Sequence, residues 1–97
     1  MKISYAITVC NEHKEIEKLL TFLFEHKRKK DQVVVQMDKD NVTDEVFNIC
    51  EQFEKHPFDE YRLIQCELNK NFAQYKNNLN KNCDGNWIFQ IDADEIP

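Results

Sequence analysis

Residues 33–50, VVVQMDKDNVTDEVFNIC, combine the two patterns that decide the fold. Three consecutive valines predict a buried strand, because a strand covered on both faces of a parallel sheet is apolar without alternation. After an acidic loop, Val46, Ile49, Cys50 and Phe53 recur at the spacing of one helix face. A strand followed at once by an amphipathic helix is the repeating unit of a parallel α/β sheet.

The same unit is repeated on both sides of this stretch. Further strands are expected over residues 3–9, 62–66 and 87–91, and a turn over residues 84–86. Two more helices are expected to turn apolar side chains inward: Ile16, Leu19, Leu20 and Leu23 in the first, and Phe72, Tyr75 and Leu79 in the last. The order βαβαβαβ predicts a Rossmann-like, three-layer αβα fold with a mainly parallel sheet.

Local signals place the ends of the helices. Asn11 is expected to cap the first helix, with Glu12 in its first turn, and Asn71 to cap the third. The second helix begins after Asn41 or Thr43, and His56-Pro57 is expected to end it. The aromatic side chains of Phe22, Phe24 and Trp87 are expected to pack in the core or along its flank.

Length and composition limit the possible functions. The 97 residues, 41% of them hydrophobic, predict one domain over residues 1–97. A formal charge of −5 argues against binding nucleic acid. No apolar stretch approaches the roughly 20 residues of a membrane span, and no export signal is recognisable. The four cysteines form no CxxC pair, so we expect reduced thiols and a cytoplasmic protein.

The expected ligand edge is acidic. Ligands of such sheets bind beyond the carboxyl ends of the strands, here residues 8–12, 37–43, 67–71 and 92–95. The chain has a single glycine, Gly85, which excludes the glycine-rich phosphate loops. Asp92 and Asp94 stand two apart at a strand end and could bind Mg²⁺ or Mn²⁺, which prefer carboxylate oxygens. The alternative is a solvated acidic turn.

Four stretches give the sequence a family resemblance. They are ITVCNE, VVVQMDKDNVTDE, NFAQYKNNLNKNCDGNWIFQ and IDADE, in the order and at the spacing typical of that family. With them the sequence resembles the amino-terminal, nucleotide-sugar-binding half of a family 2 glycosyltransferase of GT-A fold, a nucleotide-diphospho-sugar transferase. The resemblance covers essentially the whole chain, and IDADE with the preceding GNWIFQ is its most specific part.

The resemblance implies roles for individual residues. Thr8, Asn11 and Glu12 match the loop that lines the nucleotide pocket, and Asp38 matches the acid that contacts the base or ribose. Lys76 replaces the usual arginine facing the nucleotide. Asp92 matches the first acid of the DxD motif, near the ribose and the metal. Asp94 matches the direct ligand of Mn²⁺ or Mg²⁺, which bridges to the diphosphate of a nucleoside-diphosphate sugar, with a UDP-sugar favoured.

The resemblance also implies what the chain lacks. In the family, the acceptor site and the general base lie carboxyl-terminal to the DxD motif, so no catalytic base is assigned within residues 1–97. We therefore expect a truncated fold that binds weakly and catalyses little or nothing on its own, and a homodimer through the exposed edge of the fourth strand. The alternatives are a non-catalytic nucleotide-binding or dimerising remnant and a nucleotidyltransferase-like fragment.

Overall fold

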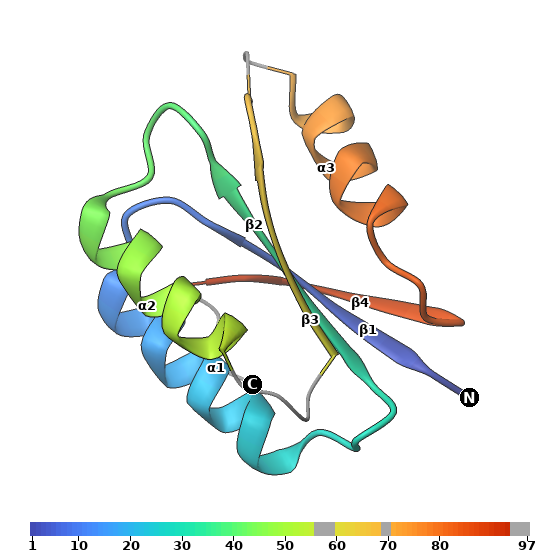
Figure 1. Ribbon diagram of the computed structural model, residues 1–97. Helices are drawn as coiled ribbons and strands as arrows, with labels where there is room; N and C mark the ends of the chain where they lie inside the picture. The colour runs from blue at the N-terminus through green and yellow to red at the C-terminus, as the bar shows by residue number, and fades with distance from the viewer. Residues whose placement is uncertain (56–59, 69–70, 94–97) are drawn as a thin grey trace.

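The computed structural model describes residues 1–55, 60–68 and 71–93. Within them the predicted order βαβαβαβ is confirmed (Figure 1). The elements are β1 (Ile3–Val9), α1 (His13–His26), β2 (Gln32–Asp38), α2 (Asp44–Glu54), β3 (Glu60–Cys66), α3 (Phe72–Lys81) and β4 (Trp87–Asp92).

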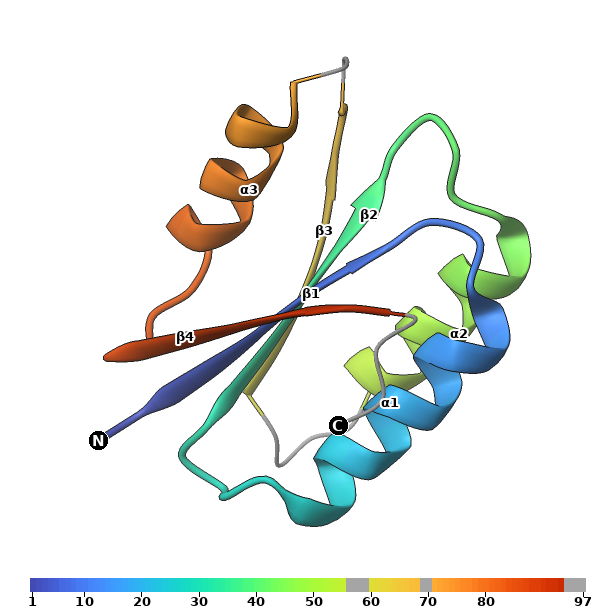
Figure 2. The same ribbon diagram turned by 180° about the vertical axis from the view of Figure 1, so that it is seen from behind.

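The four strands form one parallel sheet in the order β3-β2-β1-β4. Helices α1 and α2 cover one face of this sheet and α3 lies on the other, as Figures 1 and 2 show from opposite sides. The predicted three-layer αβα architecture is therefore confirmed. The chain steps outward from β1 to β2 and β3, then returns to place β4 on the other side of β1. Ligands of open α/β sheets bind where the strand order reverses in this way, here between β1 and β4.

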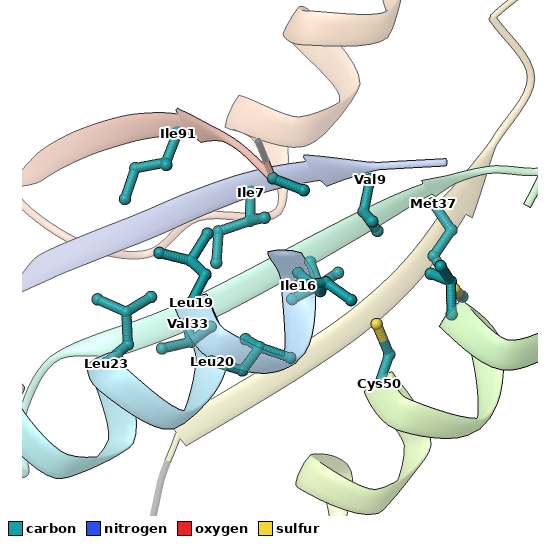
Figure 3. Close-up of a cluster of buried hydrophobic side chains, with 13 residues drawn as sticks. Ile7, Val9, Ile16, Leu19, Leu20, Leu23, Val33, Met37, Cys50 and Ile91 are labelled. Carbon is teal, nitrogen blue, oxygen red and sulfur yellow. The ribbon is translucent and has the colours of Figure 1, made fainter. Parts of the chain in front are cut away.

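The main hydrophobic core fills the space between the sheet and helices α1 and α2 (Figure 3). Ile7, Val33 and Val35 of the sheet and Ile16 and Leu20 of α1 are completely buried. This agrees with the predicted apolar face of α1 and with the continuous valine run, whose strand is buried along its whole length. The burial of apolar surface here is the main force that holds the fold together.

Helix α3 is attached in a different way. Its apolar cluster contains only Ala6, Val34 and Leu79 as fully buried members among the described residues. Hydrogen bonds supplement it: Gln36 Nε2 donates to the Tyr75 carbonyl oxygen over 2.9 Å, and Asn78 Nδ2 donates to Gln36 Oε1 over 2.8 Å. These directional contacts set the position of α3 along β2, and so of the side chains that α3 presents at the sheet edge.

Three local predictions can be compared with the helix ends. Asn71 caps α3 as expected, since its side chain accepts from the Gln74 N–H over 3.1 Å. Of the two candidates for α2, Thr43 is the cap and accepts from the Val46 N–H. The prediction for Asn11 was wrong: Glu12 occupies the cap position of α1, and its carboxylate accepts from the Asn11 N–H over 3.0 Å.

Three aromatic residues are more exposed than predicted. Phe72 is 68% exposed because it begins α3 at the carboxyl edge of the sheet, where it borders a hollow rather than the core. Trp87 is 62% exposed because β4 is an edge strand, and Phe22 stacks on His26 on the outside of α1. Phe24 packs against the core as expected. The predicted helix stop at His56-Pro57 lies outside the described residues.

Gly85 is required by a close approach between the turn before β4 and the start of β1. A Cβ atom at Gly85 would lie 2.7 Å from both the backbone nitrogen and Oγ of Ser4. The Gly85 N–H donates to Ser4 Oγ over 2.8 Å, and the Asn86 N–H donates to the Lys2 carbonyl oxygen over 2.8 Å. The only glycine of the sequence therefore sets how β4 enters the sheet beside β1.

The buried carboxylate of Asp31 predicts a loss of stability in acid. Arg28 donates to both of its oxygens, over 2.9 and 3.1 Å, and the Ile3 N–H donates to one of them over 2.9 Å. The Arg28 hydrogen bonds, with help from Ile3, hold the pKa of Asp31 below its ordinary value of 3.8. The contribution of Asp31 is therefore complete above that value and is lost as the pH falls through the lower, folded-state pKa.

Urea unfolding between pH 2.5 and 6 measures this contribution. We expect the free energy of unfolding to fall less steeply with acid in Asp31→Asn than in the wild type. Equal slopes for Asp31→Asn and the wild type would contradict the assignment.

Candidate ligand-binding site

A hollow of about 240 Å³ lies at the carboxyl ends of β1, β2 and β4, beside the first turn of α3. One part of its lining consists of oxygen-bearing side chains, which belong to residues at the ends of strands or in the loops that follow. The other part is apolar or aromatic and comes from α3, the segment before it and Val9 of β1. The lining residues are Thr8, Val9, Cys10, Glu12, Asp38, Leu68, Phe72, Tyr75 and Asp92.

Thr8 and Asp92 meet because of the strand register. Successive side chains of a strand point to opposite faces, so Thr8 lies on the same face as Ala6, which packs with Leu79 of α3. Asp92 of β4 is paired with Thr8 in the sheet. Thr8 Oγ1 donates to Asp92 Oδ1 over 2.8 Å, and the Ala93 N–H donates to the Thr8 carbonyl oxygen over 3.0 Å. The hydroxyl thus fixes one oxygen of an exposed carboxylate.

Lys76 brings a positive charge to the same oxygen. Its Nζ lies 3.5 Å from Asp92 Oδ1, across the gap between α3 and β4. The side chains are 36% exposed for Lys76 and 53% exposed for Asp92, so water reaches both charges. Solvent weakens such an ion pair, which leaves both groups able to exchange partners when a charged ligand enters.

Asp38 is the most buried acid of the site, with 7% of its surface exposed. Its Oδ1 accepts from the Asp40 N–H over 3.2 Å, and its Oδ2 accepts from Asn41 Nδ2 over 3.0 Å. Its carbonyl oxygen accepts from the N–H groups of Asn41 and Val42. Asp38 therefore shapes the loop after β2 and at the same time borders the hollow.

The remaining residues predicted for the site differ in whether they line the hollow. Glu12 lines the hollow, whereas Asn11 is exposed and does not belong to its lining. Asp94, the predicted direct metal ligand, lies outside the described residues. Across residues 1–55, 60–68 and 71–93, no cluster of three or more His, Cys, Asp or Glu side chains could hold a metal ion.

Sequence reasoning missed the apolar part of the hollow. Tyr75 was predicted to point inward, and it does, but it also lines the hollow beside Phe72 and Leu68. Burial, and next the charge of Asp38, raise the pKa of Tyr75 above its ordinary value, so it stays a neutral phenol. The helical spacing of Tyr75 and Leu79 could show which face of α3 is buried. It could not show that one end of this face reaches a ligand edge.

Cys10 also lines the hollow, and its surroundings keep it protonated. Burial raises the pKa of its thiol, and the negative charges of Asp38 and Glu12 raise it further. Its Sγ lies 3.5 Å from the Asn41 carbonyl oxygen, which suits an S–H donor. Cys10 is therefore a polar lining residue rather than a nucleophilic thiolate.

Comparison with known proteins completes these observations. The family model described as "Glycosyl transferase family 2" matches residues 4–97. The matched region includes every strand end that borders the hollow. A search of curated proteins found no match. In the part of the chain that the structure describes, no helix has the length and apolar character needed to cross a bilayer.

Proposed function

Because the chain belongs to the family 2 glycosyltransferases, we propose that its hollow binds the nucleoside diphosphate of a sugar donor, with UDP-sugars favoured. The observation that supports this most is the convergence of Thr8, Lys76 and Asp92 at the strand-order reversal. An ammonium group there suits a phosphate, and the neighbouring carboxylate and hydroxyl suit a ribose or a metal. The apolar lining from Phe72 and Leu68 offers a surface for the base.

The donor set also fits a divalent cation. Asp92 offers a hard oxygen ligand that is half exposed to water, and Asp94 follows it two positions later in the sequence. Mg²⁺ commonly binds through one or two carboxylates, keeping waters and sharing substrate phosphates. We propose that Asp92 and Asp94 would hold Mn²⁺ or Mg²⁺. When bound, such an ion stabilises the negative charge that develops on a departing nucleoside diphosphate.

The chain's own residues have separate tasks in this proposal. Thr8 orients Asp92 by donating to its Oδ1. Lys76 offers its ammonium to a phosphate oxygen. Asp38, held in place by its loop, borders the hollow where the base or ribose would lie.

The proposed reaction is glycosyl transfer with inversion. An acceptor oxygen attacks the anomeric carbon from the face opposite the diphosphate, and the new C–O bond forms as the bond to the diphosphate oxygen breaks. The electron pair of the broken bond leaves with the nucleoside diphosphate. A general base must take the acceptor proton, and we assign this role to none of the described residues.

Thermal unfolding with added nucleotides tests the proposal. A ligand that binds only the folded chain raises its stability by RT ln(1 + [L]/Kd). UDP, GDP and CDP are compared, each with Mn²⁺, with Mg²⁺ and with EDTA. We expect UDP to raise the melting temperature more in Mn²⁺ than in EDTA. A chain that melts at the same temperature with every nucleotide would favour the non-catalytic remnant.

A specific observation also supports self-association through β4. This strand is paired with β1 on one side, and no other described strand pairs with it. Trp87, Ile88 and Phe89 are 62, 41 and 56% exposed. No side chain from Trp87 to Ile91 carries a charge, so two antiparallel β4 strands would meet without like charges opposite each other. We propose a second copy of this chain as the occupant of this edge.

Sedimentation equilibrium checks the dimer. We expect the wild type to associate in the micromolar range and Phe89→Glu to remain a monomer, because the glutamate would bury a charge in the paired edge. Phe22→Glu is the matched control, since it also changes an exposed aromatic residue but lies on α1, and it should still associate. A monomeric wild type throughout this range would contradict the proposal.

A further inference from the structure

The ion pair between Lys76 and Asp92 occupies the place where the proposed metal would bind. Lys76 Nζ and the Thr8 hydroxyl both face Asp92 Oδ1, at 3.5 and 2.8 Å. Thr8 lies near the carboxyl end of the inner strand β1, and Lys76 follows Tyr75, which is hydrogen-bonded to Gln36 through both its carbonyl and its phenol. Both of these groups that face Asp92 are therefore positioned by the fold.

A cation at Asp92 would meet an ammonium group in its immediate surroundings. The repulsion between like charges at such range weakens binding by about fivefold or more, even in a largely aqueous environment. The metal would also displace Lys76 from a carboxylate that already has a favourable partner. Lys76 should therefore weaken the binding of a divalent cation on its own.

A nucleoside diphosphate reverses the sign of this effect. Its phosphates bring several negative charges, so Lys76 can move from Asp92 to a phosphate oxygen with no loss of charge pairing. Lys76 then no longer opposes a cation at Asp92, and the phosphates attract this cation as well. The ammonium group of Lys76 thus opposes the binding of the metal alone. It would favour the binding of the diphosphate, and thereby the binding of diphosphate and metal together.

On this basis we propose that Lys76 is a resident counter-ion of Asp92 that makes metal binding depend on the nucleoside diphosphate. This inference rests on the proposed function and adds an order of ligand binding to it. The diphosphate binds first or together with the metal, and the metal does not bind alone. Lys76 would thus be a ligand-binding residue that couples two ligands by reciprocal linkage.

The test measures ligand affinity rather than activity. Electron paramagnetic resonance of free Mn²⁺ gives the Mn²⁺ affinity of the chain, first alone and then with saturating UDP, after subtraction of the Mn²⁺ that the same UDP binds without protein. Calorimetry in EDTA gives the affinity for UDP alone. The variants are Lys76→Met, Lys76→Arg and Lys81→Met. The last removes the same charge from the exposed end of the same helix and controls for net charge.

Three results are expected. Without nucleotide, Lys76→Met binds Mn²⁺ about fivefold to tenfold more tightly than the wild type, as the repulsion estimate implies. Lys76→Arg and Lys81→Met remain within about twofold of the wild type. In EDTA, Lys76→Met binds UDP more weakly. Because this variant already binds Mn²⁺ more tightly without UDP, the factor by which UDP improves Mn²⁺ affinity becomes smaller than in the wild type.

The failures of the inference and of the proposed function can be told apart. If the wild type binds UDP with Mn²⁺ but Lys76→Met binds Mn²⁺ alone no more tightly, the counter-ion role is wrong and the proposed function stands. If Lys81→Met matches Lys76→Met, the effect is one of net charge and the inference is also wrong. If the folded wild type binds neither UDP nor Mn²⁺, both are overturned.

Discussion

Leu20→Ala is expected to lower the free energy of unfolding by about 2–5 kcal/mol, the usual cost of emptying a core position. Leu20 is completely buried between α1 and the sheet, among Ile7, Ile16 and Val33 (Figure 3). The sheet beneath it is held in register by three parallel strand pairs and cannot easily collapse into the cavity. A domain of this size has a total stability of only about 5–15 kcal/mol.

Urea denaturation followed by circular dichroism measures this loss. Thr21→Ala is the matched control, because Thr21 is the next residue of α1 and is exposed; its effect should stay within about 0.5 kcal/mol. Leu20→Met retains most of the volume and should cost less than about 1.5 kcal/mol. If Leu20→Ala were no more destabilising than Thr21→Ala, the main core would not lie between α1 and the sheet.

Asp92→Ala is expected to weaken UDP binding in Mn²⁺ by about tenfold to a hundredfold, which corresponds to about 1.4–2.7 kcal/mol. The substitution removes the carboxylate that contacts both Thr8 and Lys76 at the hollow. Its side chain is 53% exposed, so the folded chain should keep its stability in the absence of ligand. Loss of binding without loss of stability would distinguish a ligand-contacting acid from a structural one.

Asp92→Asn distinguishes the role of the negative charge of Asp92 from the role of its hydrogen bond with Thr8. The amide oxygen can still accept from Thr8 Oγ1, but it offers a much poorer ligand for a divalent cation. We expect the Mn²⁺-dependent part of the UDP affinity to disappear and the metal-free part to remain within a few-fold of the wild type. The same Mn²⁺ dependence in Asp92→Asn and the wild type, by titration calorimetry, would contradict a metal role for Asp92.

The sequence predicted the elements well because their signals are local. The valine run of β2 and the apolar spacing of α1 depend only on neighbouring residues, and both match the structure. The caps at Thr43 and Asn71 also act within a single turn. Such patterns fix the fold class, because few arrangements can bury alternating strands and amphipathic helices.

The site depends on contacts that local patterns cannot show. Thr8 and Asp92 lie at opposite ends of the sequence and meet only because β4 returns to pair with β1. Lys76 reaches the same carboxylate through the position of α3, which Gln36 sets from β2. The family resemblance assigns Thr8, Lys76 and Asp92 to the same nucleotide-sugar site. The sequence pattern alone could not give their distances or show that Lys76 pairs with Asp92.

The errors share a cause: exposure is decided by neighbours from other parts of the chain. Phe72 fits the apolar face of α3 by its spacing, but the helix begins where the sheet ends. Trp87 is in a strand, but this strand lies at an edge. Asn11 is a good capping residue, yet the chain turns one residue later and Glu12 takes that position.

A crystal structure of the chain with UDP and Mn²⁺, with the manganese located by its anomalous scattering, would show whether the nucleotide and the metal meet at Asp92. We expect a manganese peak at Asp92 with diphosphate oxygens among its ligands, Lys76 turned toward a phosphate, and the uridine in the hollow beside Asp38. A nucleotide bound with its phosphates away from Asp92, or a hollow without nucleotide at saturating concentration, would contradict this expectation.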